Sequence, residues 1–337
     1  MCIRHLKALK DAVKNSIAAR RDSIRTSLVT KPSPEEDKNA SVRVIETLIP
    51  LLLAHAGPYV ADTSPGAIQG LARREYEKFR LSVDPLDLSR DPGTSKFFFQ
   101  MSRLEIEQLP EGPISDRVQN NMETMRDVID HGTPFFREQG SPMRGHVQIL
   151  ECYFRHTIIL PRIGPKNQRA KLAFFTGWKM LLGYSPRCSR PSPIRPDWAC
   201  TNGWTCNDSR FPHFKATMWT DANAVEQEPL RAEVATILGI MAERHRAEEL
   251  RAHTIIPVLL VSFVGPRHAR ILLAHFDGER LKIEMSKLLP ITTDDNTNMD
   301  TLIRWWAAKV NRTATTTEPL KHAVENLPHS TSNKCPD

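Results

Sequence analysis

The stretch that decides the predicted fold reads IIPVLLVSFVGPRHARILLAHFDGERLKIEM and spans residues 255–285. It opens with a continuous apolar, β-branched run, which is typical of a strand buried on both faces. Gly265-Pro266 indicates a turn, and Asp277-Gly278 is a hairpin dipeptide. We therefore expect a three-stranded antiparallel meander covered by helices. Its strands are predicted at Ile255–Phe263, Ala269–Phe276 and Leu281–Met285.

The chain before this stretch is predicted to be mostly helical, because its apolar residues recur at helical spacing. Helices are expected at Ser41–Ala56, Ala67–Leu81, Ser115–Ile129, Gly145–Thr157 and Asn167–Leu182, then from Pro229 to Arg251, and after the meander at Leu302–Ala308. The predicted fold class is α+β. It has a mostly helical N-terminal part, a long Pro/Trp/Cys-rich loop, and a C-terminal helix plus the three-stranded antiparallel meander.

The domain plan follows from composition. Five prolines between Ser185 and Met218 interrupt any period, so a long structured loop is expected there. We predict an amphipathic basic helix at 1–31 and a linker at 32–40. A single α+β globular domain is expected at 41–312, with the loop-rich segment at 185–219, followed by a polar tail at 313–337.

The first helix leaves three interpretations open. Its basic face is either the solvated side of a helix packed on the core, a mitochondrial presequence, or a helix lying on a membrane surface. Asp11 and Asp22 count against the presequence. The chain shows no secretory signal and no apolar run of the roughly 18 residues that span a bilayer. The expected location is therefore cytoplasmic or nuclear, with mitochondrial targeting left open.

The net charge of +7 is unevenly distributed. Residues 151–219 hold 11 Lys and Arg, only 3 Asp and Glu, and 11 of the 23 aromatic residues. Cations that neutralise phosphates and rings that stack on bases are typical of single-stranded nucleic-acid binding. The alternative is that the rings lie in the core and the cations pair with the acidic segment 32–150. Candidate contacts to nucleic acid or another acidic partner are Arg187, Arg190, Arg195, Trp198 and Trp204.

The same segment contains residues of the types that bind zinc: Cys188, Cys200, Cys206 and His213. Their spacing is C-x11-C-x5-C-x6-H, whereas structural zinc sites usually pair cysteines two to four residues apart. Ordinary buried thiols are the competing interpretation. No cofactor is expected, and zinc is the one metal that the sequence leaves open.

Several enzyme classes lack their motif here. Neither G-x-x-x-x-G-K-[ST] nor G-x-G-x-x-G occurs, which argues against nucleotide-binding loops of these two types. These observations favour a non-enzymatic intracellular binding or interaction protein. The alternative is an enzyme whose site is assembled from distant residues, which sequence spacing alone does not reveal.

Four short motifs carry a resemblance. They are Gly183-Tyr-Ser-Pro-Arg187, Pro196-Asp-Trp-Ala-Cys200, Ile256-Pro-Val-Leu-Leu-Val-Ser262, and His268-Ala-Arg-Ile-Leu272 with His275-Phe-Asp-Gly278. Over residues 85–290 the chain resembles a set of uncharacterised proteins from filamentous fungi. The resemblance implies a shared fold and a eukaryotic intracellular setting, and it brings no activity, cofactor or catalytic residue with it.

Overall fold

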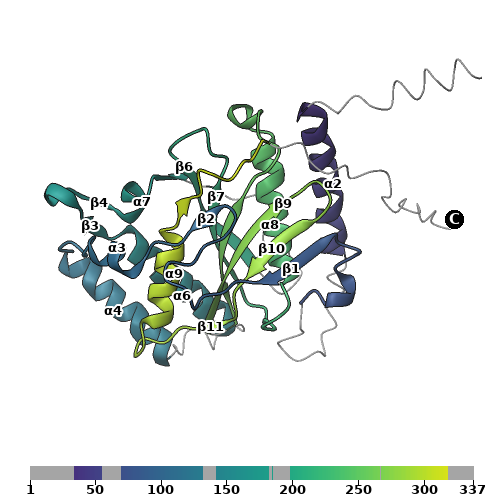
Figure 1. Ribbon diagram of the computed structural model, residues 1–337. Coiled ribbons are helices and arrows are strands. Elements are labelled where there is room, and N and C mark those ends of the chain that lie inside the picture. The colour runs from purple at the N-terminus through teal and green to yellow at the C-terminus, as the bar shows by residue number, and fades with distance from the viewer. Residues whose placement is uncertain are drawn as a thin grey trace, which may run out of the picture.

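The centre of the protein is one mixed eight-stranded sheet with helices on both faces (Figure 1). The computed structural model describes residues 34–54, 70–131, 142–181, 184, 198–265 and 267–317. Neighbouring strands follow the order β1-β10-β9-β8-β7-β6-β5, and β11 pairs with β9. These strands are β1 (Leu81–Pro85), β5 (Trp178–Leu181), β6 (Trp198–Cys206), β7 (Phe214–Thr220), β8 (Val258–Val264), β9 (His268–Phe276), β10 (Leu281–Met285) and β11 (Leu289–Pro290).

Two pairs of strands in this sheet are parallel. β5, β6 and β7 form antiparallel pairs, after which helix α8 (Arg231–His245) leads the chain to β8, which lies parallel to β7. β8, β9 and β10 are again antiparallel, and β1 adds to β10 in parallel. The carboxyl ends of β1, β7, β8 and β10 therefore lie at the same edge of the sheet.

The two faces of the sheet carry separate cores. On one face, α8 and α2 (Pro34–Ala54) pack on alternate residues of the strands, such as Phe214, Ala216 and Met218 of β7. The opposite face is covered by α6 (Pro142–Ile159) and α9 (Thr297–Trp306), and α4 (Asp116–His131) packs on α6. Both faces of the central strands are thus removed from water, which is the main source of stability for such a sheet.

Smaller elements complete the fold. β2 (Phe98–Phe99) pairs with β12 (Lys309–Val310), and β3 (Pro161–Ile163) pairs with β4 (Arg169–Lys171). Two short helices are α3 (Arg103–Glu107) and α7 (Leu172–Phe175), and the 3-10 turns are η1 (Arg73–Glu75), η2 (Pro165–Asn167) and η4 (Glu248–Leu250). Within the described ranges, no helix is both long enough and apolar enough to cross a membrane.

The predicted fold class, an α+β chain whose sheet is a three-stranded meander, is wrong. The three predicted strands pair antiparallel around Asp277-Gly278, but they form only part of the mixed sheet. The missed strands β6 and β7 lie largely within the segment expected to be a loop, residues 185–219. Their polar residues are accommodated because buried partners satisfy them, as Glu151 does for Thr201 and Thr217.

Two helix predictions and one linker prediction also need correction. Helix α2 begins at Pro34, within the predicted linker 32–40. The segment 167–182 is a turn, a strand, a short helix and a second strand, and Gly177 with a φ of 77° interrupts any helix there. The stretch from Arg73 to Arg80 is a 3-10 turn followed by further turns. The predicted helix 1–31 and residues 318–337 of the predicted tail lie outside the described residues.

Candidate nucleic-acid interface

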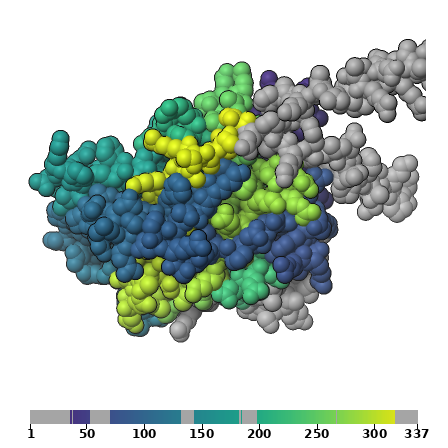
Figure 2. All heavy atoms as spheres, viewed as in Figure 1, coloured from purple at the N-terminus to yellow at the C-terminus, as the bar shows by residue number. Residues whose placement is uncertain are grey.

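A basic hairpin projects from one end of the molecule. It consists of β3, the turn η2 and β4, and it leads through α7 into β5 (Figures 1 and 2). Residues 161–181 contain five Lys and Arg and no Asp or Glu. Lys166 and Asn167 at the tip both adopt left-handed backbone with a φ of 58°, a conformation that non-glycine residues rarely adopt. We call residues 161–171 the basic hairpin.

The cations of this region are open to solvent. Lys166, Arg169, Lys171 and Lys179 are all exposed, and none of them forms a salt bridge with another residue that the structure describes. Arg169 donates one hydrogen bond to the carbonyl oxygen of Pro113 at 3.1 Å, which ties its side chain to the segment before α4. These four charges are therefore available to an anionic partner.

An apolar cleft of about 360 Å³ opens beside the hairpin, and we call it the aromatic cleft. Trp178, Trp204 and Trp306 lie among its lining residues. Lys171, Lys179 and Phe174 also line it and are exposed, and Phe174 has 56% of its surface in water. Because Phe174 belongs to the apolar lining of the cleft, its exposed ring extends an apolar surface patch, and such patches mark interaction sites.

A buried lysine fixes the tryptophans of the aromatic cleft. Lys215 on β7 donates from Nζ to the carbonyl oxygens of Trp306 at 2.6 Å and Ala308 at 2.7 Å, where α9 ends. The same Nζ lies 3.8 Å from the centre of the Trp178 ring. Burial lowers the pKa of Lys215 well below its usual value, and a neutral amine still has two N–H groups for the two carbonyls. Lys215 is thus a structural support for the cleft.

The position of α6 depends on a second buried polar group. Glu151 Oε1 accepts hydrogen bonds from the hydroxyls of Thr201 at 2.7 Å and Thr217 at 3.0 Å. Thr201 lies at an irregularity in the pairing of β6 with β7, between Cys200 and Asn202. This network ties α6 to the centre of the sheet and so sets the place of Ile158 and Ile159, which line the aromatic cleft.

The predicted nucleic-acid contacts are distributed differently from expectation. Trp204 is only 2% exposed and packs edge-to-face on Trp306, with ring centres 4.3 Å apart, so it forms a wall rather than an open stacking surface. Trp198 is half-buried and packs against the core on the α8 side. Arg187, Arg190 and Arg195 lie outside the described residues.

Some cations of segment 151–219 do pair internally, as the alternative interpretation predicts. Arg162 forms a salt bridge with Glu111 at 3.0 Å, and Glu111 belongs to the acidic segment 32–150. Arg210 pairs instead within its own segment, with Asp208 at 2.7 Å, which that interpretation did not predict. The basic segment thus divides into internally paired arginines and the exposed cations of the hairpin region.

The predicted zinc site does not form with its two central cysteines. Cys200 and Cys206 lie six residues apart on β6, which places their Cα atoms roughly 20 Å apart, whereas two ligands of one zinc lie within about 4 Å of each other.

His213 is the other candidate ligand that the structure describes, and it is buried among the rings of Phe97, Phe98 and Phe211. Burial raises the pKa of the Cys206 thiol. Cys188 lies outside the described residues, and the described part of the chain holds no cluster of three or more His, Cys, Asp or Glu suited to a metal.

Sequence reasoning did not identify Phe174 as an exposed ring at the site. The prediction of a helix over Asn167–Leu182 gave no reason to separate it from its buried neighbours. One signal was available, because no Asp or Glu occurs between Glu151 and Asp197. That interval contains the whole hairpin and the exposed ring.

The comparisons with known proteins leave the site to be interpreted from its own geometry. No protein-family model matches the sequence, and neither a curated protein nor a solved structure is significantly similar to it.

Proposed function

We propose that the protein binds single-stranded nucleic acid at the basic hairpin and the aromatic cleft. The phosphates would contact Lys166, Arg169, Lys171 and Lys179, and a base would stack on Phe174. The observation that carries the proposal is the exposed Phe174 ring at an apolar cleft, flanked by cations that form no salt bridge with the described residues, in a stretch of chain without acids. Cations that follow a backbone and rings that stack on bases are the two requirements of sequence-tolerant single-strand binding.

The chemistry of the cleft favours binding over catalysis. Its described lining has no carboxylate, histidine or cysteine, which are the side chains that most often serve as general bases or bind transition metals. The lysines that line it are exposed and act as point charges for phosphate.

Salt dependence gives the proposal a magnitude. If four phosphates are contacted, the logarithm of the association constant of a single strand should fall with a slope of about −2.8 against the logarithm of salt concentration. A rise from 50 to 200 mM salt then weakens binding about 50-fold. If binding involved only the apolar cleft, its affinity would change little with salt concentration.

The test is fluorescence anisotropy of a labelled oligo-dT and a labelled oligo-rU at these two salt concentrations. Phe174→Ala should lower the affinity about 5- to 150-fold, because stacking of one base is worth about 1–3 kcal/mol. Lys171→Glu with Lys179→Glu should abolish binding at 200 mM. The matched controls are Leu104→Ala, which shortens another exposed apolar side chain, and Arg43→Glu, which reverses an exposed charge on α2. Circular dichroism confirms that each variant is folded.

Three results would overturn the proposal. The first is no anisotropy change with folded protein at 50 mM salt. The second is unchanged affinity in Phe174→Ala. The third is equal competition by polyglutamate, which would show that any acidic polymer suffices and that the ring has no role.

A further inference from the structure

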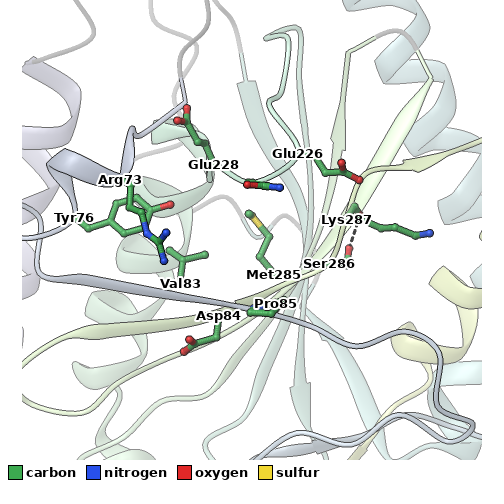
Figure 3. Close-up of a pocket in the computed structure, with 11 residues that line it drawn as sticks. Arg73, Tyr76, Val83, Asp84, Pro85, Glu226, Glu228, Met285, Ser286 and Lys287 are labelled. Carbon is green, nitrogen blue, oxygen red and sulfur yellow. Dashed lines mark hydrogen bonds between the residues drawn. The ribbon is translucent and has the colours of Figure 1, made fainter.

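A second cleft, of about 470 Å³, lies at the edge of the sheet where the carboxyl ends of four strands meet (Figure 3). We call it the edge cleft. Four separate segments of the chain build it: the turn η1, the end of β1, the loop between β7 and α8, and the end of β10. In α/β proteins, ligands bind preferentially outside the carboxyl ends of the strands.

The edge cleft combines an apolar base with charged walls. Val83, Pro85 and Met285 supply apolar surface at the ends of β1 and β10. Figure 3 shows Arg73 and Tyr76 on one side, Glu226 and Lys287 on the opposite side, and Glu228 between them at the top. The charged lining residues are Arg73, Asp84, Glu226, Glu228 and Lys287.

The charged side chains of the edge cleft remain outside the ion pairs that the structure describes. Among the described residues, none of the five charged side chains that line the edge cleft forms an ion pair with another. Arg73 and Glu228 come from segments that are far apart in sequence but joined by the backbone hydrogen bond from Leu71 N to Pro229 O, 2.8 Å long. Charges of both signs thus surround one apolar base, which suits a ligand that itself carries both signs.

Buried contacts hold the loop that carries Glu226 and Glu228. Arg270 is fully buried and makes two hydrogen bonds to Glu233, from Nε at 2.8 Å and from Nη2 at 2.5 Å. Its third bond, from Nη1 to the carbonyl oxygen of Val225 at 3.1 Å, fixes the residue that precedes Glu226. A Cβ atom at Gly70 would lie only 2.6 Å from Glu228 Oε2, so Gly70 leaves the space that this carboxylate occupies.

We infer that the edge cleft binds a zwitterionic small molecule of about dipeptide size. Its carboxylate would pair with Arg73, its ammonium with Glu226 and Glu228, and its side chain would contact Val83 and Met285. Three carboxylates in the lining disfavour a polyanion, and cations on both sides of the cleft disfavour a polyamine. The inference is independent of the nucleic-acid proposal, because the two clefts share no lining residue.

The probe is the dipeptide glycyl-leucine, titrated into the full chain by isothermal calorimetry up to millimolar concentration. Two matched probes each lack one charge: N-acetyl-glycyl-leucine has no ammonium, and glycyl-leucine amide has no carboxylate. Each should bind about tenfold more weakly than glycyl-leucine, because a charge-assisted hydrogen bond contributes at least about 1.5 kcal/mol and 1.4 kcal/mol is a factor of ten.

Variants of the lining residues test which side chain binds the ammonium and which binds the carboxylate of the dipeptide. Glu228→Gln should reduce the preference for the free ammonium and leave the preference for the carboxylate, whereas Arg73→Gln should do the reverse. Gly70→Ala should act like Glu228→Gln by displacing that carboxylate. The control is Glu123→Gln on α4, an exposed carboxylate that does not line the edge cleft. All of these variants should bind labelled oligonucleotide as the parent does.

The inference is overturned if folded protein gives no saturable heat with glycyl-leucine. It is also overturned if the acetylated and amidated probes bind as tightly as glycyl-leucine, since the walls would then not recognise charge.

Discussion

At the scale of single residues, the pair Arg270–Glu233 is an ion pair that is completely removed from water. Both side chains are fully buried, and two hydrogen bonds join them. Glu233 Oε2 also accepts the backbone N–H of Leu230 at 2.8 Å, just before α8 begins. Since removing one member of a buried ion pair leaves an unpaired charge, we expect Glu233→Gln to lower the free energy of unfolding by about 3–5 kcal/mol in urea denaturation.

The control for this prediction is a double variant. Glu233→Leu with Arg270→Met removes both charges and refills the volume, so it should cost less than the sum of the two single substitutions. A loss below about 1 kcal/mol in Glu233→Gln, or simple additivity of the single substitutions, would contradict the view that the pair is a coupled unit.

At the scale of elements, the turn between β9 and β10 connects the edge of the sheet to its centre, because β1 pairs with β10 and β10 with β9. Gly278 has a φ of 95°, and the Asp277 carboxylate accepts the N–H groups of Glu279 at 2.9 Å and Arg280 at 2.8 Å. We expect Gly278→Val to destabilise the protein by about 1–2 kcal/mol, because β-branched residues do not tolerate positive φ. Hydrogen exchange should accelerate in β10 and in its parallel partner β1.

The matched substitution for this turn is Glu279→Ala, at the exposed neighbouring position, which should leave exchange in β1 and β10 unchanged. Equal exchange in Gly278→Val and in the parent protein would show that β1 is held by other contacts.

How much of each element could be predicted depended on where its partners lie. The hairpin dipeptide and the apolar periodicity are local, so the predicted helices that became α4, α6, α8 and α9 and the strands β8, β9 and β10 were found. β7 was missed because its sequence FKATMWT looks half-polar, although every residue is buried. Lys215 is accommodated by carbonyl oxygens 91 and 93 residues further along the chain, which no local pattern reveals.

At the scale of the whole molecule, the charge distribution located the candidate site but not its residues. The excess of cations in residues 151–219 was visible in the sequence, and the exposed hairpin lies within that segment. Which ring remains exposed was decided by packing: Trp204 is covered by Trp306, whereas Phe174 on α7 is not covered by the described core. The edge cleft had no local signature, because its four segments meet only through the topology of the sheet.

The stability of the whole molecule should fall in mild acid because histidines are buried in both cores. Burial lowers the pKa of His213 from its usual 6.5 to about 3, and that of His245 likewise to about 3. Between these values the unfolded chain binds more protons than the folded one, so unfolding becomes more favourable as the pH falls below about 6.5. Each of the two histidines should lower the free energy of unfolding by about 2 kcal/mol at pH 5 relative to pH 7.

The test is the variant His213→Phe, which keeps a ring among Phe97, Phe98 and Phe211. In urea denaturation at the two pH values, we expect this variant to lose the part of the pH dependence that His213 contributes. Substitution of the exposed His131 should leave the pH dependence of stability unchanged. Equal acid sensitivity of His213→Phe and the parent chain would show that burial of His213 does not contribute to this pH dependence.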